Sequence, residues 1–164
     1  MQAIYLTGLM GAGKTTVGKE LASKLGLIVM DTDEQIVKQE GKSINEIFAL
    51  HGESYFRELE SKMLAGLPTE NIVITTGGGI ILAEENRKFM KERGTVVYLD
   101  ANPEEILVRL QHDQSRPLLA KDKQNVIFLL YKDRLPLYEE SCHLKITTTG
   151  KDIEAIVNEI IACF

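Results

Sequence analysis

The sequence predicts a three-layer α/β sandwich, in which a five-stranded parallel sheet lies between two layers of helices. Five short runs rich in β-branched residues alternate with amphipathic stretches, which is the order typical of a parallel α/β sheet. The runs lack polar/apolar alternation, as expected for strands that helices cover on both faces. The expected strands are residues 3–6, 27–30, 72–75, 95–99 and 144–147.

Periodicity and capping signals place helices between these strands. Apolar residues recur at helical spacing in residues 17–25 and 153–161, so both segments should be core-facing helices. Ser43 followed by Glu46 is the capping-box signature of a helix start. The Asn-Pro pair at 102–103, which two glutamates follow, marks another helix start.

The chain should form one domain, residues 1–164. Its composition shows no break along this length, and a chain of this size buries most of a single core. With 26% charged and 44% hydrophobic residues, it resembles a soluble globular protein rather than a disordered or fibrous one.

Charge and hydropathy exclude several kinds of partner. The net charge is −5, so the overall balance attracts neither nucleic acid nor an anionic membrane surface. No apolar run approaches the roughly 18 residues of a membrane-spanning helix. Met1 leads into a strand-like segment without the basic region or cleavage site of a signal peptide. We therefore expect a cytoplasmic protein without nucleic-acid or membrane partners, and we expect a monomer.

Cysteine and histidine usage suggests neither a disulfide framework nor a zinc site. Cys142 and Cys163 stand in unrelated contexts without metal-ligand spacing, and we expect both to be reduced. The three histidines form no pattern that would put two ligands on one helix face. We assign them no catalytic role.

Residues 8–15 match the phosphate-binding pattern G-x-x-x-x-G-K-[ST], at the junction between the first expected strand and the first expected helix. In such a loop the backbone N–H groups surround phosphate oxygens, and the following helix directs its positive end at the same anion. Lys14 should reach the β- and γ-phosphates of ATP, and the Thr15 hydroxyl should ligate Mg²⁺. The backbone groups concerned are those of Gly11, Ala12 and Gly13.

A second carboxylate that helps to hold Mg²⁺ usually ends a neighbouring strand, yet residues 72–75 are followed by Thr76 and Gly77. The nearest substitutes are Asp31 and Asp33, directly after the second expected strand and therefore at the same edge of the sheet. Taken alone, these aspartates are also typical of turn or helix-capping residues.

Several motifs in order resemble the shikimate kinase family, and the resemblance runs from residue 8 to about residue 139. Most of the motifs are weak individually, but their ordered combination is specific. They are the loop 8–16, Asp31-Thr32-Asp33, Phe56-Arg57-Glu58-Leu59-Glu60, Thr76-Gly77-Gly78-Gly79, Ser115-Arg116-Pro117-Leu118-Leu119, and Arg134 with Tyr138-Glu139.

The resemblance implies a fold like that of nucleoside monophosphate kinases, with P-loop NTPase topology, and a single kinase domain. It also implies transfer of the γ-phosphoryl group from MgATP to the 3-hydroxyl of shikimate. The catalytic residues that it implies are Lys14, Asp33 and Arg116. The ATP-binding residues that it implies are Gly11, Ala12, Gly13, Lys14, Thr15, Thr16, Arg109 and Arg116.

Further roles follow from the same resemblance. Asp31 would contact the water shell of Mg²⁺, and Asp33 would hydrogen-bond the acceptor hydroxyl. Arg57 and Arg134 would hold the substrate carboxylate, since a planar guanidinium suits a carboxylate better than an ammonium does. The backbone of Gly78 and Gly79 would also contact the substrate, because glycine lets a ligand approach closely. Without the resemblance, Arg57 is equally an ion-pair partner of nearby glutamates on its helix.

Two regions complete the expected site. Residues 33–61 would form a helical substrate-binding region, and residues 111–123 would form a lid that carries Arg116 as an arginine finger over the phosphoryl group. An ordinary surface connection is the alternative for this segment. Arg109 is similar to the family's adenine-stacking arginine, but it also has a possible ion-pair partner at Glu105.

Two other functions fit parts of the pattern. A gluconate kinase would share the phosphate loop and phosphorylate a hydroxy acid, but Arg57, the three glycines and Arg134 argue against it. A nucleotide-binding sensor domain without transfer activity would need only the loop, so the presence of Lys14, Asp33 and Arg116 together argues against this alternative.

Overall fold

The computed structural model describes residues 1–110 and 123–164, and it contains the expected five-stranded parallel sheet. The strands follow the order β2-β3-β1-β4-β5 across the sheet, and all four neighbouring pairs are parallel. Their bounds are β1 Ala3–Thr7, β2 Ile28–Asp31, β3 Ile72–Thr75, β4 Gly94–Asp100 and β5 Leu144–Thr147. Every predicted strand is therefore confirmed, with ends that differ by no more than one residue.

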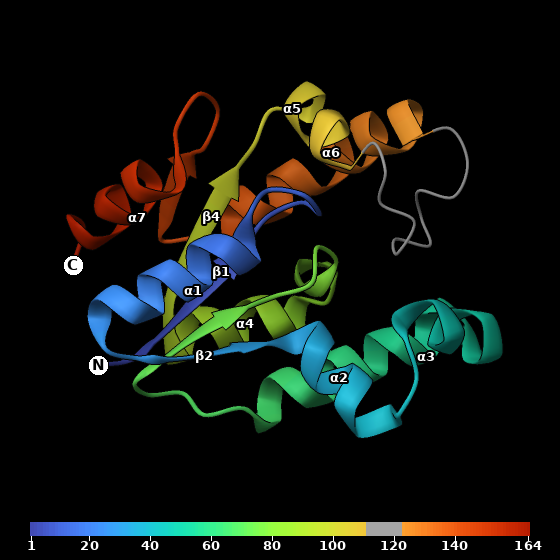
Figure 1. Cartoon of the computed structure of the whole chain (residues 1–164). Helices are drawn as coiled ribbons and strands as arrows, with labels where there is room; N and C mark the ends of the chain where they lie inside the picture. The colour runs from blue at the N-terminus through green and yellow to red at the C-terminus, as the bar shows by residue number, and fades with distance from the viewer. Residues whose placement is uncertain (111–122) are drawn as a thin grey trace.

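Helices connect the strands and cover the sheet (Figure 1). The expected starts after Ser43 and after Asn102 are confirmed: Ser43 and Glu46 form a complete capping box, and the Asn102 side chain accepts a hydrogen bond from Glu104 N–H. The helices are α1 Lys14–Leu25, α2 Thr32–Glu40, α3 Ile44–Gly66, α4 Glu84–Arg93, α5 Pro103–Arg109, α6 Lys123–Ser141 and α7 Ile153–Ile161, with a short 3-10 helix, η1, at Ile80–Leu82.

The two faces of the sheet bury separate apolar cores because successive strand residues point to opposite sides. In β1, Ile4 and Leu6 face α1 and α7, which lie side by side in Figure 1. Ala3 and Tyr5 point the other way, into a core shared with α4, α6 and the end of α3. Coverage is incomplete at the edge strand β2, where Ile28 is 54% exposed. The prediction of two-sided coverage is therefore right for the central strands and wrong for this edge strand.

Helices α2 and α3 pack together as a small unit beside the sheet, with their own core of Ile36, Ile47 and Phe56. Gly52 interrupts α3 with φ 81° and ψ 175°, so the chain bends between the two halves of the helix. This backbone conformation suits glycine because it has no Cβ to clash. The unit spans residues 32–66 and includes the expected helical region at residues 33–61, whose role in substrate binding stays a prediction.

Because all strands are parallel, their carboxyl ends meet at one edge of the sheet. The phosphate loop, defined as residues 8–15, follows β1 at this edge, and Asp31 ends β2 there. The glycine turn, defined as residues 77–79, follows β3. Ligands of open α/β sheets bind in the crevice outside this edge. Among the helices of the described residues, 1–110 and 123–164, none combines the length and apolarity needed to cross a bilayer.

The close packing of α1 on the sheet generates a prediction about stability. A Cβ added at Gly18 would lie 2.3 Å from Thr75 Cγ2 on β3, so Gly18→Ala forces α1 away from the sheet. The expected loss of unfolding free energy is about 1–3 kcal/mol, measured by urea titration. The control is Gly66→Ala, because no atom lies within 4 Å of the added Cβ. Equal effects of the two substitutions would contradict this packing argument.

Candidate active site

The phosphate loop has the backbone geometry of an anion cradle. Gly8, Gly11 and Gly13 adopt φ values of 148°, 79° and 94°, which side-chain-bearing residues rarely reach. Gly13 is the N-cap of α1, and within the described part of the chain no side chain caps this helix. The first N–H groups of α1 are thus directed at the loop, where they and the helix dipole favour an anion.

Lys14 lies over the loop rather than in solvent. Its Nζ donates hydrogen bonds to Gly8 O at 2.6 Å and Leu9 O at 3.0 Å. Arg109 on α5 approaches the same loop, donating to Gly11 O at 3.0 Å and to the Glu105 carboxylate at 2.7 Å. The expected ion pair with Glu105 is therefore present, and Arg109 also borders the phosphate loop.

Two adjoining cavities occupy the carboxyl edge of the sheet. The phosphate cavity, of about 220 Å³, is lined by the loop, Arg109 and the start of α1. The acceptor cavity, of about 400 Å³, lies between the sheet edge and the α2–α3 unit. Six residues line both: Met10, Thr15, Asp31, Asp33, Gly77 and Gly78. A group bound in one cavity can therefore meet a group bound in the other.

Asp31 and Thr15 present hard oxygen ligands at this junction. Asp31 is the N-cap of α2, accepting from Glu34 N–H at 3.1 Å, and its second oxygen accepts from the Thr75 hydroxyl at 2.7 Å. The capping alternative is thus correct for Asp31. A carboxylate has about four acceptor sites, so these two bonds leave capacity for metal-bound water. Oxygen ligands of this kind fit Mg²⁺.

Within the described residues no three His, Cys, Asp or Glu side chains form a metal cluster. Thr15 and Asp31 offer one hydroxyl and one carboxylate, and Mg²⁺ in nucleotide sites is held by few protein ligands of this kind together with water and phosphate.

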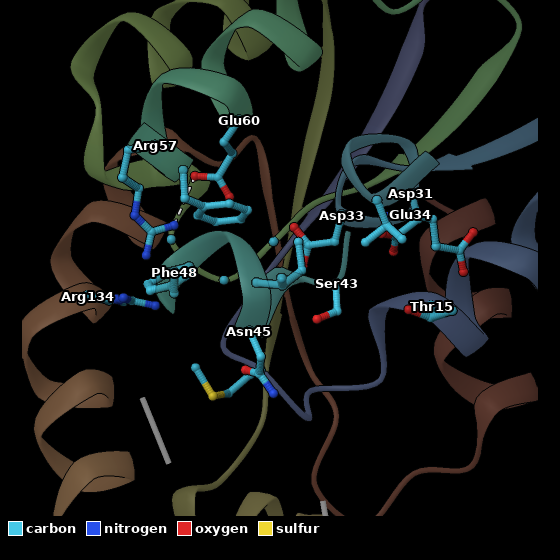
Figure 2. A pocket seen from close by; sticks show the side chains of 17 residues that line it. Thr15, Asp31, Asp33, Glu34, Ser43, Asn45, Phe48, Arg57, Glu60 and Arg134 are labelled. Atoms are coloured by element: carbon cyan, nitrogen blue, oxygen red, sulfur yellow. Dashed lines mark hydrogen bonds and ion pairs between the residues drawn. The ribbon is translucent and has the colours of Figure 1, made fainter. Parts of the chain in front are cut away.

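Asp33, on the first turn of α2, lines both cavities, and Figure 2 shows it among the residues of the acceptor cavity. Its Oδ1 is buried, and it would lie 2.9 Å from a Cβ added at Gly77. The Gly77 N–H donates to Thr32 Oγ1 at 3.1 Å, which fixes the glycine turn against α2. The carboxylate of Asp33 is therefore held where the contents of the two cavities would meet.

Arg57 enters the acceptor cavity from α3 and pairs with two glutamates of the same helix (Figure 2). It donates to Glu60 at 3.0 Å and to Glu53 at 3.2 Å. The two partners differ, because the side chain of Glu53 is 50% exposed whereas that of Glu60 is 1% exposed. The solvated ion-pair alternative describes only the contact with Glu53.

Burial dominates the electrostatics of Glu60. Desolvation raises the pKa of its carboxyl to about 7, although the nearby Arg57 guanidinium lowers it, and the negative charge of Asp33 adds to the increase. A buried carboxyl that accepts a hydrogen bond from a guanidinium orients it, so Glu60 fixes the orientation of the Arg57 guanidinium. Sequence reasoning named Glu60 only as an ion-pair partner, and its burial could not be read from helical spacing.

Arg134 enters the acceptor cavity from the buried side of α6, at the same end of the cavity as Arg57 (Figure 2). One turn later, Tyr138 donates a hydrogen bond to Gly78 O, which joins α6 to the glycine turn. Burial raises the pKa of the Tyr138 hydroxyl, so this group remains a donor. The two arginines predicted to act together thus converge on one cavity from different helices.

Two of the three glycines, Gly77 and Gly79, leave room for charged side chains. A Cβ at Gly79 would lie 2.3 Å from Arg57 Nη1, and one at Gly78 would lie 3.4 Å from Arg134 Nη1. One at Gly77 would lie 2.8 Å from Glu60 Oε2. We expected glycine here because a ligand approaches the backbone. The geometry shows a further reason at Gly77 and Gly79, since a carboxylate and an arginine of the protein occupy the space of the missing side chains there.

Sequence reasoning did not identify the apolar wall of the acceptor cavity. This wall is formed by Met10, Val37, Ile44, Phe48 and Phe56. These residues follow ordinary helical spacing or lie in the loop, so no local signal distinguishes them from core residues. Two further predictions, Arg116 and the lid up to residue 122, lie outside the residues that the structure describes. Lys123 begins α6.

Comparison of the sequence with known families gives one consistent result. The family model described as shikimate kinase matches residues 10–164. A shikimate kinase from Bacillus anthracis (strain CDC 684 / NRRL 3495) is 51% identical over 160 residues, which cover 98% of this chain and 96% of that relative.

Solved structures agree with the sequence comparison. The shikimate kinase from Acinetobacter baumannii in complex with shikimate superimposes with a TM-score of 0.96 at 40% identity, covering 99% of this chain and 92% of that one. A gluconokinase from Sinorhizobium meliloti 1021 has a TM-score of 0.57 at 15% identity and covers 98% of this chain and 89% of that one. The second likeness supports the fold alone.

The raised pKa of Glu60 predicts how stability depends on pH. The carboxyl keeps its proton up to about pH 7 in the folded protein, against an ordinary value of 4.5. The folded state therefore binds more protons between these values, and the unfolding free energy falls as pH rises through them. Relative to Glu60→Gln, the ligand-free wild type should lose up to about 3 kcal/mol across this window in urea titrations.

Glu53→Gln is the matched control, because it removes the exposed partner of the same arginine. This variant should keep the pH dependence of the wild type. A stability difference between wild type and Glu60→Gln that stays constant with pH would contradict the prediction.

Proposed function

The chain belongs to the shikimate kinase family, and on that premise we propose that it transfers the γ-phosphoryl group of ATP to the 3-hydroxyl of shikimate. The products are shikimate 3-phosphate and ADP. The observation that carries this proposal is the pair of adjoining cavities, one with a phosphate loop and one with two converging arginines. Asp33 lies where they meet.

The chemistry of the acceptor cavity suits a small hydroxylated carboxylate. Arg57 and Arg134 offer two guanidinium forks that can bind a carboxylate with charge-assisted hydrogen bonds. The apolar wall, with Phe48 and Phe56 in tilted contact at 5.0 Å between ring centroids, suits the carbon face of a ring. A carboxylate held at one end of the cavity directs the hydroxyl groups of the same ring toward Asp33.

The phosphate loop binds and orients the nucleotide. Its N–H groups and the start of α1 surround the phosphates, and Lys14 turns from the loop carbonyls to the β- and γ-phosphates. Mg²⁺, when bound beside Thr15 and Asp31, neutralises part of the phosphate charge. Arg109 lies at the nucleotide end, and we assign it the adenine contact that the resemblance implies. Thr16 follows Thr15 on the first turn of α1 and belongs to the same binding loop.

Transfer requires little covalent chemistry from the protein. Asp33 accepts a hydrogen bond from the 3-hydroxyl and takes its proton as the new O–P bond forms and the bond to the ADP oxygen breaks. Positioning of the two substrates in line supplies most of the acceleration. We assign Arg116 to the phosphoryl group by resemblance to the family.

The location and assembly of the enzyme form part of the proposal. ATP is a cytoplasmic donor, so we place the reaction in the cytoplasm. We also propose that the enzyme acts as a monomer, because residues of this chain can fill every role assigned above.

Release of ADP tests the function directly. The protein should release ADP from MgATP with shikimate, and it should not do so with gluconate or buffer alone. Lys14→Ala should reduce turnover at least about 100-fold because it removes charge stabilisation of the transferred group. Circular dichroism should show an intact fold. Turnover with gluconate would indicate a gluconate kinase, and nucleotide binding without turnover would indicate a sensor domain.

The carboxylate-binding role predicts a second set of kinetics. Arg134→Ala removes a charge-assisted contact worth about 1.5–3 kcal/mol, so the KM for shikimate should rise about 10- to 150-fold while the KM for ATP changes little. Gly79→Ala should act in the same direction, because its Cβ displaces the Arg57 guanidinium without straining the backbone, which has φ −92° there.

Gly66→Ala is the control for the added methyl group, and its KM values should equal those of the wild type. If Gly79→Ala binds shikimate normally, the position of Arg57 in the ligand-free structure is not the one that binds the acceptor.

A further inference from the structure

A polar cluster outside both cavities joins the end of β4 to α6, the helix that carries Arg134. Asp100, the last residue of β4, accepts hydrogen bonds at one oxygen, Oδ1, from the hydroxyls of Tyr98 at 3.0 Å and Tyr131 at 3.1 Å. Its other oxygen lies 3.6 Å from Lys145 Nζ on β5. None of these four residues lines either cavity.

The cluster is largely buried, and its hydrogen bonds persist at neutral pH. The side chain of Asp100 is 15% exposed, and Tyr98 is buried at 1%. Burial first, and then the charge of Asp100, raises the pKa of Tyr131 to about 12 and raises that of Tyr98 as well. Both hydroxyls therefore remain protonated and donate to the carboxylate throughout the neutral range.

The cluster continues into the acceptor site through α6. The Tyr98 ring stacks on the Tyr138 ring, with centroids 4.8 Å apart and planes 10° from parallel. Tyr138 in turn donates to Gly78 O in the glycine turn. Tyr131, Arg134 and Tyr138 are spaced three and four residues apart, so they share one face of α6. Arg134 is thus flanked by two tyrosines that both reach the Asp100 cluster.

The backbone of α6 needs such support near Arg134. Pro136 lies inside this helix. Proline has no N–H, so the carbonyl four residues earlier, that of Lys132, loses its helical hydrogen bond, and the proline ring disturbs the same turn. Arg134 stands within that turn. Local helical bonding therefore fixes its position less firmly than in an uninterrupted helix.

We propose that Asp100 is a positioning residue for the acceptor site, which holds Arg134 in place through Tyr131 on one side and through the Tyr98–Tyr138 stack on the other. Asp100 touches no substrate and acts only through α6. Its loss lets the turn around Pro136 shift, and an arginine fork displaced in this way binds a carboxylate less well. This inference rests on the proposed binding of the shikimate carboxylate by Arg134.

The test uses steady-state kinetics of the full chain with shikimate and ATP varied separately. Asp100→Ala and Tyr131→Phe should raise the KM for shikimate about tenfold and fivefold, with the KM for ATP within about twofold of the wild type. Asp100→Asn keeps an acceptor oxygen and should restore most of the affinity. If Asp100→Ala does not fold, the KM for shikimate of Tyr131→Phe tests the inference by itself.

Tyr5→Phe is the matched control, because Tyr5 is a fully buried tyrosine of the same core on the neighbouring strand, outside the Asp100 cluster. It should leave both KM values unchanged. Melting temperatures of all variants show whether a substitution lowers stability. If Asp100→Ala or Tyr131→Phe melts at a lower temperature but keeps the wild-type KM for shikimate, the inference is overturned.

A double-mutant cycle distinguishes positioning through Arg134 from any other effect. In an Arg134→Ala background, Asp100→Ala should not raise the KM for shikimate further. Additive increases, or equal increases in both KM values, overturn the inference. A wild-type protein without turnover on shikimate would instead overturn the proposed function, which keeps the two failures distinct.

Discussion

Five strands that run in one direction end at one edge of the sheet, and the whole candidate site depends on this constraint. The phosphate loop, Asp31 and the glycine turn each follow a different strand, yet they lie together because parallel strands share a carboxyl edge. The strand register reinforces the arrangement. Asp31 of β2 lies opposite Thr75 of β3, and its side chain accepts a hydrogen bond from the Thr75 hydroxyl. The α2–α3 unit then closes the acceptor cavity from the side.

The acceptor cavity contains several ionisable side chains that are partly or fully buried. Arg57 and Arg134 line this cavity together with the carboxyl groups of Glu60 and Asp33. Burial still outweighs attraction at Glu60, whose raised pKa records a carboxyl that is costly to ionise there. The Arg57 and Glu60 groups fit here because Gly79 and Gly77 have no side chains, which explains a glycine at each of these two positions.

Helix α6 links the site to the rest of the fold. It supplies Arg134 to the acceptor cavity, while its tyrosines contact the glycine turn and the end of β4. An arginine fork selects a planar carboxylate only when its own direction is fixed. If Arg134 binds the substrate carboxylate as proposed, the contacts that support α6 contribute to that binding together with the arginine.

The sequence by itself determined the features that depend on local signals. Strand and helix order, the caps at Ser43 and Asn102 and the phosphate loop follow from neighbouring residues, and the family motifs named Asp33, Arg57 and Arg134. Tertiary structure alone decided the burial of Glu60, which charged groups the glycine turn accommodates, and the tie between Asp100 and α6. The glycine turn and the Asp100 cluster join residues from different strands and helices. The burial of Glu60 depends on which other elements cover its face of the helix. Helical spacing and strand alternation describe one element at a time, so they predict neither contacts between elements nor the burial that these contacts cause.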